Sequence, residues 1–169
     1  QWTHPHAFLK TASFGPDSEW IRMGYAYGTS EALLWDWRRD LMVARWVPRP
    51  EPYRFLAVSP DRKWAALVYA GSPAELWSVT VPGKPRLHGT IAPQFVRPTV
   101  VAFSNDGRRI ALGSETGQVL LVNRETMRPV ATLRGTAQSI VGLWFSANDE
   151  YLVGQADAAV VRWRAPVVE

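Results

Sequence analysis

A short polar turn flanked by apolar residues recurs at nearly constant spacing along this chain of 169 residues. Each copy begins with a small residue and precedes an apolar run. The four copies start 44, 45 and 42 residues apart, at Gly15, Ser59, Ser104 and Ser146. A second landmark lies near the end of a later apolar run, at intervals of 42, 45 and 41 residues: Trp35, Trp77, Val122 and Trp163. Because two separate landmarks share one period, the chain is built from internal repeats.

The best-preserved copy runs from Val101 to Gly135 and reads VAFSNDGRRIALGSETGQVLLVNRETMRPVATLRG. Its short apolar runs and polar turns predict four antiparallel strands joined by three tight turns. In the turn SETG, Gly117 occupies the position that requires a positive φ. The runs VVAF and VLLV are apolar at consecutive residues, so both faces of the sheet need covering. A unit of about 40 residues cannot bury both of its faces alone, which predicts a stack of such units.

This copy resembles the WD40 repeat, whose pattern is AFSPDGRxLASGSxDGxVxLWD. Parts of the pattern recur in LAVSPDRKWAALV, AELWSV and ALLWDW, so the resemblance extends over nearly the whole chain. Trp35 and Asp36 form the only literal WD pair. The Gly-His that precedes the first strand of a typical repeat is absent from three copies, and the Asp of the second turn survives only as Asp157. The hydrogen-bonded His–Ser–Asp–Trp network typical of the family is therefore mostly missing.

The resemblance implies an all-β fold of β-propeller blades, with four four-stranded antiparallel WD40-like repeats in a single propeller region, residues 1–169. The expected blades cover approximately residues 7–48, 53–92, 99–134 and 139–169, and residues 1–6 form a spare outer strand and loop. The Trp of the WD position is expected to pack between blades. Such blades suit rings of about seven or eight, so we expect a half or incomplete ring. A second copy in a homodimer, or a further propeller segment, would complete it. A closed four-blade ring and another β-sandwich arrangement are the alternatives.

Composition restricts the class of protein further. The chain is 47% hydrophobic and carries a formal net charge of +4, so it can bury a core and is only mildly basic. It has no cysteine, which excludes disulfides and cysteine-based metal sites. No apolar run approaches the roughly 18 residues that span a bilayer, and the first ten residues do not resemble a signal peptide. We therefore expect a soluble protein with no membrane span. The sequence leaves the compartment open and favours the cytoplasm over the outside.

The residues that could take part in catalysis or metal binding do not form a catalytic pattern. His4 and His6 lie two residues apart in the segment HPH, but no third ligand follows nearby, so no metal and no cofactor are expected. Serine-nucleophile, P-loop and dinucleotide-binding motifs are absent from the sequence. Asp17, Asp61 and Asp106 recur with the repeat, which marks them as turn formers and not as an acid–base pair. The sequence therefore predicts that the protein is not an enzyme.

Propeller topology sends the connections between strands to two opposite faces. One face receives basic and acidic residues in nearly equal number, so nucleic-acid binding is not expected. The other is richer in the aromatic and arginine side chains that dominate protein interfaces. Its two longest connections, VPRPEPYR and TIAPQFVRPT, are proline-rich and lose little entropy on binding. The predicted partner-binding residues on this face are Tyr27, Arg49, Tyr53, Tyr69, Phe95 and Arg97.

Two functions are compatible with these observations. The first is a non-enzymatic module for protein–protein interaction or scaffolding, which is the role expected by analogy with WD40-like propellers. The alternative is a ligand-sensing or enzyme-associated propeller domain of a larger protein, inside or outside the cytoplasm, with a small ligand in its central channel. A phosphate-backbone binder is a weaker third reading.

Overall fold

The computed structural model describes residues 8–14, 19–26, 30–95, 97–135 and 137–166. Every helix or strand among them is a β-strand, which confirms the all-β fold class. The first sheet consists of β1 (Phe8–Phe14), β2 (Trp20–Ala26), β3 (Ser30–Asp36) and β4 (Leu41–Arg49). The second consists of β5 (Tyr53–Val58), β6 (Trp64–Tyr69), β7 (Ala74–Ser78) and β8 (Arg86–Ile91). The third consists of β9 (Pro98–Phe103), β10 (Arg109–Ser114), β11 (Gln118–Asn123) and β12 (Pro129–Arg134).

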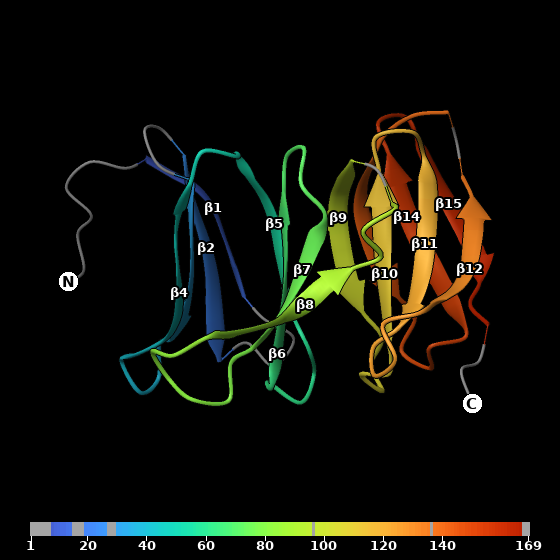
Figure 1. Cartoon of the computed structure of the whole chain (residues 1–169). Helices are drawn as coiled ribbons and strands as arrows, with labels where there is room; N and C mark the ends of the chain where they lie inside the picture. The colour runs from blue at the N-terminus through green and yellow to red at the C-terminus, as the bar shows by residue number, and fades with distance from the viewer. Residues whose placement is uncertain (1–7, 15–18, 27–29, 96, 136, 167–169) are drawn as a thin grey trace.

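The fourth sheet has three strands among the described residues: β13 (Ile140–Phe145), β14 (Tyr151–Ala156) and β15 (Ala159–Arg164). In every sheet the strands follow chain order and pair antiparallel, as propeller blades do. Consecutive sheets pack against each other, and Figure 1 places the first and the fourth at opposite ends of the molecule. The spare outer strand expected at residues 1–6 lies outside the described residues. No helix in the described part of the chain is long and apolar enough to cross a membrane.

The strand register repeats in all four sheets. In all four sheets, the residue at the WD position pairs with the second residue of the sheet's second strand. The pairs are Trp35 with Ile21, Trp77 with Ala65, Val122 with Ile110, and Trp163 with Leu152. The period read from the sequence is therefore a period of backbone pairing.

The turn between the first and second strands of a sheet is held by one serine hydroxyl. Ser59 Oγ accepts a hydrogen bond from the Trp64 N–H at 3.0 Å and donates one to Asp61 at 2.5 Å. Ser104 and Ser146 make the same pair of bonds in the third and fourth sheets. The first copy of the turn lies partly outside the described residues. The SETG turn also matches its prediction, because Gly117 has a φ of 78°.

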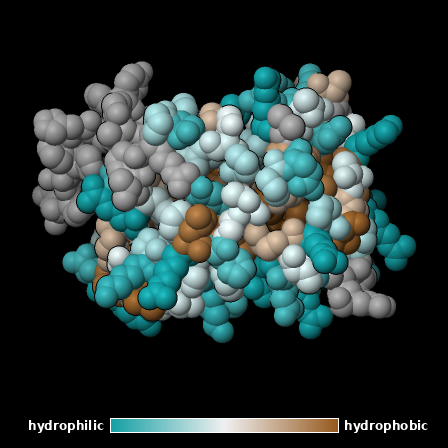
Figure 2. All heavy atoms as spheres, in the orientation of Figure 1, coloured by the Kyte–Doolittle hydropathy of each residue, from teal (hydrophilic) through white to brown (hydrophobic). Residues whose placement is uncertain are grey.

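Apolar residues fill the three spaces between consecutive sheets. Trp77 packs against the core between the first and second sheets, and its ring meets that of Trp46 edge to face, with centroids 6.2 Å apart. Val122 is buried between the second and third sheets, and Trp163 packs between the third and fourth. In these three repeats the WD position therefore packs between sheets, as expected. In Figure 2 most of the viewed surface is hydrophilic or neutral, and hydrophobic residues form small separate groups on both halves of the molecule.

Candidate functional site

Three of the four aromatic members of the predicted partner-binding set lie in the core. Tyr53 is 5% exposed and Tyr69 is 1% exposed, and their rings meet edge to face with centroids 6.4 Å apart. Phe95 is 9% exposed and packs between the second and third sheets. Of the remaining members, Arg49 ends β4, and Tyr27 lies outside the described residues. The three rings stabilise the fold, and partner contact through them stays a prediction.

Arg97 is exposed. Its backbone has a φ of 56°, and its guanidinium lies 3.5 Å from the Glu115 carboxylate. Glu115 also accepts a hydrogen bond from Arg54 of β5 at 2.6 Å. Arg54 of the second sheet and Arg97 of the connection before β9 therefore share one carboxylate, which leaves this cluster with a net positive charge.

A hollow of about 390 Å³ opens beside Arg54. Its lining comes from the second, third and fourth sheets: Pro52, Tyr53, Arg54, Ala70, Thr99, Ser139 and Val141. Thr99 donates its hydroxyl to the carbonyl oxygens of Gly113 and Ile140, which joins the third sheet to the fourth. The sequence prediction included Tyr53 and missed Arg54, because a single arginine within an apolar strand carries no local signal of its surroundings.

An inner hollow of about 270 Å³ is lined by residues of all four sheets. Most of the lining is aromatic or aliphatic, and Arg22 is its one charged residue. The lining residues are Phe14, Arg22, Phe55, Ala57, Val58, Val101, Ala102, Phe103, Asn105, Leu143, Trp144 and Phe145. An apolar hollow with one convergent cation suits a ligand group that is apolar and carries one negative charge.

The carboxylates of the repeated turns have structural partners. Asp106 accepts hydrogen bonds from the Ser104 hydroxyl at 2.6 Å and the Arg108 N–H at 2.9 Å. Burial raises the pKa of Asp106, but these bonds and the neighbouring arginine charges outweigh it and hold the pKa below its ordinary value. Asp149 accepts the main-chain N–H groups of Asn105 and Asp106, at 2.8 and 2.9 Å, and so joins the third and fourth sheets. Asp61 and Asp106 therefore form turns, as predicted, and Asp17 lies outside the described residues.

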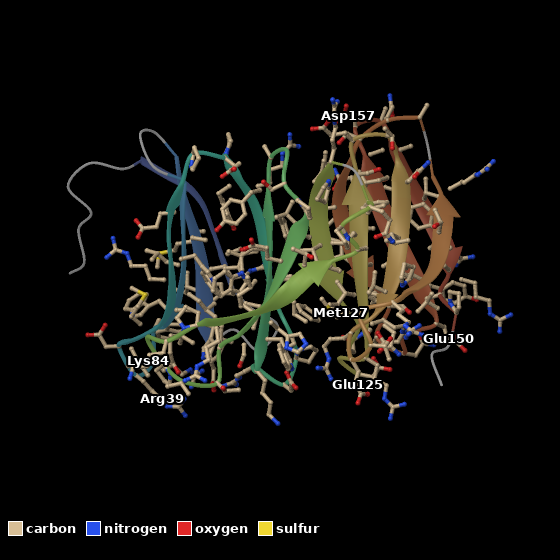
Figure 3. All side chains as sticks on the ribbon, in the orientation of Figure 1. Arg39, Lys84, Glu125, Met127, Glu150 and Asp157 are labelled. Carbon is tan, nitrogen blue, oxygen red and sulfur yellow. The ribbon has the colours of Figure 1, made fainter. Side chains whose placement is uncertain are left out.

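Charged side chains of both signs lie at the ends of the strands. Figure 3 shows Arg39, Lys84, Glu125 and Glu150 towards one end of the sheets and Asp157 at the other. The turns that join first to second and third to fourth strands therefore share one end, as the propeller topology predicts. A surface of mixed sign has no strong field to attract a phosphate backbone.

The described residues contain no group of three or more His, Asp or Glu side chains that could hold a metal ion. The pair His4 and His6 lies outside the described residues. His88 is exposed on β8, and its ring meets that of Trp64 edge to face with centroids 4.9 Å apart. The hollows, and not a cluster of titratable groups, are therefore the candidate site.

Comparison with known proteins gives similarities in both sequence and structure. No protein-family profile matches the chain. It is 27% identical over 143 residues to telomerase protein component 1 of Rattus norvegicus and 26% identical over 132 residues to that of Mus musculus. These matches cover 80% and 73% of this chain and 5% of each relative, so the chain spans a small part of their length.

Among solved structures, the chain is similar to the β-propeller domain of Myceliophteria_thermophila Cps50 (Swd1), with a TM-score of 0.75 and 13% identity. The similarity covers 95% of this chain and 54% of that chain. The chain therefore spans about half the length of that solved propeller. At this level of identity the likeness concerns the fold.

Proposed function

Because the chain is a WD40-like β-propeller segment with degenerate repeats, we propose that it is a non-enzymatic module for protein–protein interaction or scaffolding. The fold itself serves many functions, so the proposal depends on the surface that it presents. The observation that carries it is the hollow beside Arg54, which three sheets build together with the charged cluster of Arg54, Arg97 and Glu115. Arginine is enriched among the residues that dominate interface energies, and a concave surface is where such an arginine can contact a partner side chain.

The test is cross-linking of the purified chain to proteins of its source cells, followed by mass spectrometry and by binding measurements with each purified partner. Arg97→Ala is expected to weaken a genuine partner at least tenfold while leaving the melting temperature unchanged, because Arg97 is exposed. Arg86→Ala, which alters an exposed arginine of β8, is the matched control. Equal binding by both variants would place the interaction surface elsewhere. Tyr53 is unsuitable for this test because truncating a buried ring destabilises the fold.

We also propose that a second copy or a further propeller segment covers the free face of the fourth sheet. Large apolar side chains are exposed on its strands: Val141 is 48% exposed, Trp144 53% and Val160 74%. The third sheet differs, since all six residues of its central strand β10 are buried between neighbouring sheets. A sheet with apolar residues on both faces gains stability when both are covered.

Ligand sensing within a larger protein is the second candidate function. The observation that favours it is the inner hollow, where aromatic side chains from several sheets surround Arg22. A library of small metabolites screened by thermal denaturation tests it directly. A saturable rise in melting temperature with one chemical class supports ligand sensing, and a flat response to the whole library counts against it.

A further inference from the structure

Arg22 is a cation placed within the apolar interface between the first and second sheets. Its Nη1 donates to the Leu56 carbonyl at 2.8 Å and its Nη2 to the Phe14 carbonyl at 3.3 Å. The guanidinium lies over the Phe55 ring, 5.6 Å from the centroid. Its Nε is buried without a hydrogen-bond partner, and no carboxylate of the described residues forms an ion pair with it. Burial lowers the pKa of Arg22 below its ordinary value, and nearby Tyr53 opposes this effect.

Arg109 lies in a similar environment, but its environment includes a carboxylate. Its guanidinium also donates to two main-chain carbonyls, of Pro166 at 2.8 Å and Asp149 at 3.0 Å, and lies 5.3 Å from the Phe145 ring centroid. In addition it has the Asp149 carboxylate 3.9 Å away. Arg22 thus has the carbonyls and the ring, but among the described residues it has no acidic neighbour.

The fold does not require an arginine at this position. By strand register, the equivalent residues of the second, third and fourth sheets are Ala66, Ala111 and Val153. A small apolar residue therefore satisfies the same packing in three repeats. Burying a cation without a counter-charge costs stability. Such a cost, borne at one repeat only, is typical of a residue retained for binding.

Arg22 also lines two hollows. One, of about 380 Å³, lies between β1 and β5, and its other lining residues are Ala12, Ser13, Tyr53, Arg54, Phe55 and Leu56. It forms because β5 packs more extensively against β2 and β3 than against β1. The second is the inner apolar hollow. Among the described residues neither lining contains an acidic side chain, and both contain Arg22.

We propose that Arg22 anchors a carboxylate-binding site, and that its ligand is an aspartate or glutamate side chain of a partner protein followed by an apolar residue. The carboxylate pairs with the guanidinium in the hollow between β1 and β5, and the apolar residue enters the inner hollow. Guanidinium groups bind carboxylates with two aligned hydrogen bonds, and the pairing is strong in a partly desolvated site. This inference rests on the proposed function in protein–protein interaction, and it specifies the chemistry that the partner supplies.

The experiment uses the ¹⁵N-labelled chain and two blocked peptides, Ac-Gly-Glu-Phe-Gly-NH2 and Ac-Gly-Gln-Phe-Gly-NH2. The glutamate peptide is expected to shift the Arg22 Nε–H resonance and the amides of Phe55 and Leu56 saturably. The glutamine peptide should bind at least tenfold more weakly. Arg22→Met removes the charge from an apolar interface, so we expect it to fold and to abolish the glutamate-specific shifts. Arg86→Gln, at an exposed arginine of β8, is the control and should bind as the parent does.

Equal binding of the two peptides, or unchanged binding by Arg22→Met, would overturn the site. If Arg22→Met fails to fold, Arg22→Lys keeps the charge without the planar fork, and unchanged affinity in that variant would likewise overturn it. Phenylacetate serves as a third probe: if it binds more tightly than the glutamate peptide, the ligand is a free carboxylic acid and the partner assignment is wrong. Failure of these tests leaves the protein-capture experiment with Arg97→Ala unaffected, so the two proposals fail separately.

Discussion

Gly113 of β10 lies at the contact between the third sheet and β13 of the fourth. A Cβ at this position would lie 2.8 Å from the Cβ and Cγ2 of Ile140 and 2.8 Å from Cγ1 of Val100. Both neighbours are buried and β-branched, so they have little freedom to move away. We expect Gly113→Ala to lower the free energy of unfolding by about 1–3 kcal/mol in urea denaturation.

Gly89 of β8 provides the control for this substitution, because a Cβ there meets nothing within 4 Å. Gly89→Ala is expected to be neutral or slightly stabilising, since it restricts the unfolded chain without a clash. If both variants were equally stable, the close contact of the third and fourth sheets at Gly113 would be contradicted.

Asp36 makes the stability of the first sheet depend on pH. Its carboxylate accepts the N–H groups of Arg38 at 3.1 Å and Arg39 at 3.0 Å and pairs with the Arg39 guanidinium at 3.1 Å. Burial raises the pKa of Asp36, but the Arg39 N–H and charge outweigh it, so the pKa lies below its ordinary value. The folded state therefore binds protons less readily than the unfolded state.

It follows that the contribution of Asp36 is present at neutral pH and is lost as pH falls below about 4, through the lowered folded-state pKa. We expect Asp36→Asn to be less stable than the parent at pH 7 and to lose less stability on acidification. Urea denaturation at several pH values between about 7 and 3 measures both effects. A variant with an unchanged acid dependence would show that Asp36 does not contribute to it.

At the scale of the strand, the place of a strand's sheet in the row of sheets determines how much unfolding free energy a truncated side chain costs. All six residues of β10 are buried, since the third sheet has neighbours on both faces, whereas exposed and half-buried residues alternate along β15. We expect Leu112→Ala in β10 to cost about 2–5 kcal/mol of unfolding free energy, through lost burial and a cavity. Val160→Ala in β15 should stay within about 0.5 kcal/mol in the single chain, because that side chain is 74% exposed there. Equal losses in urea denaturation would contradict the arrangement of sheets.

At the scale of the whole molecule, the row has two end sheets, each with one face that no other sheet of the described chain covers. If a second copy covers the fourth sheet, light scattering should give a mass approaching twice 19.0 kDa as concentration rises. Trp144→Glu combined with Val160→Lys should then return the mass to that of one chain. A single-chain mass at every concentration would contradict the homodimer and leave a further propeller segment as the proposed cover.

The sequence by itself determined the repeat, the strands and the turn chemistry. These features are local: the Ser104 hydroxyl bonds within its own turn, and the register of Trp77 against Ala65 follows from a short hairpin. Most of the sheet architecture was predictable for that reason, and so was the packing of Trp163 between sheets. Repetition made these predictions robust, because each feature appears in several copies.

Only the tertiary structure decided which side chains are available to a ligand. Tyr53 and Phe95 belong to connections that read as a surface, yet the neighbouring sheets bury them. No motif in the sequence singles out Arg22, yet it lines two hollows because the first sheet meets the second through β2 and β3. Burial depends on contacts between residues far apart in the chain, and those contacts are set by how whole sheets stack. The candidate site therefore depends on how the sheets stack, whereas the blades follow from local sequence patterns.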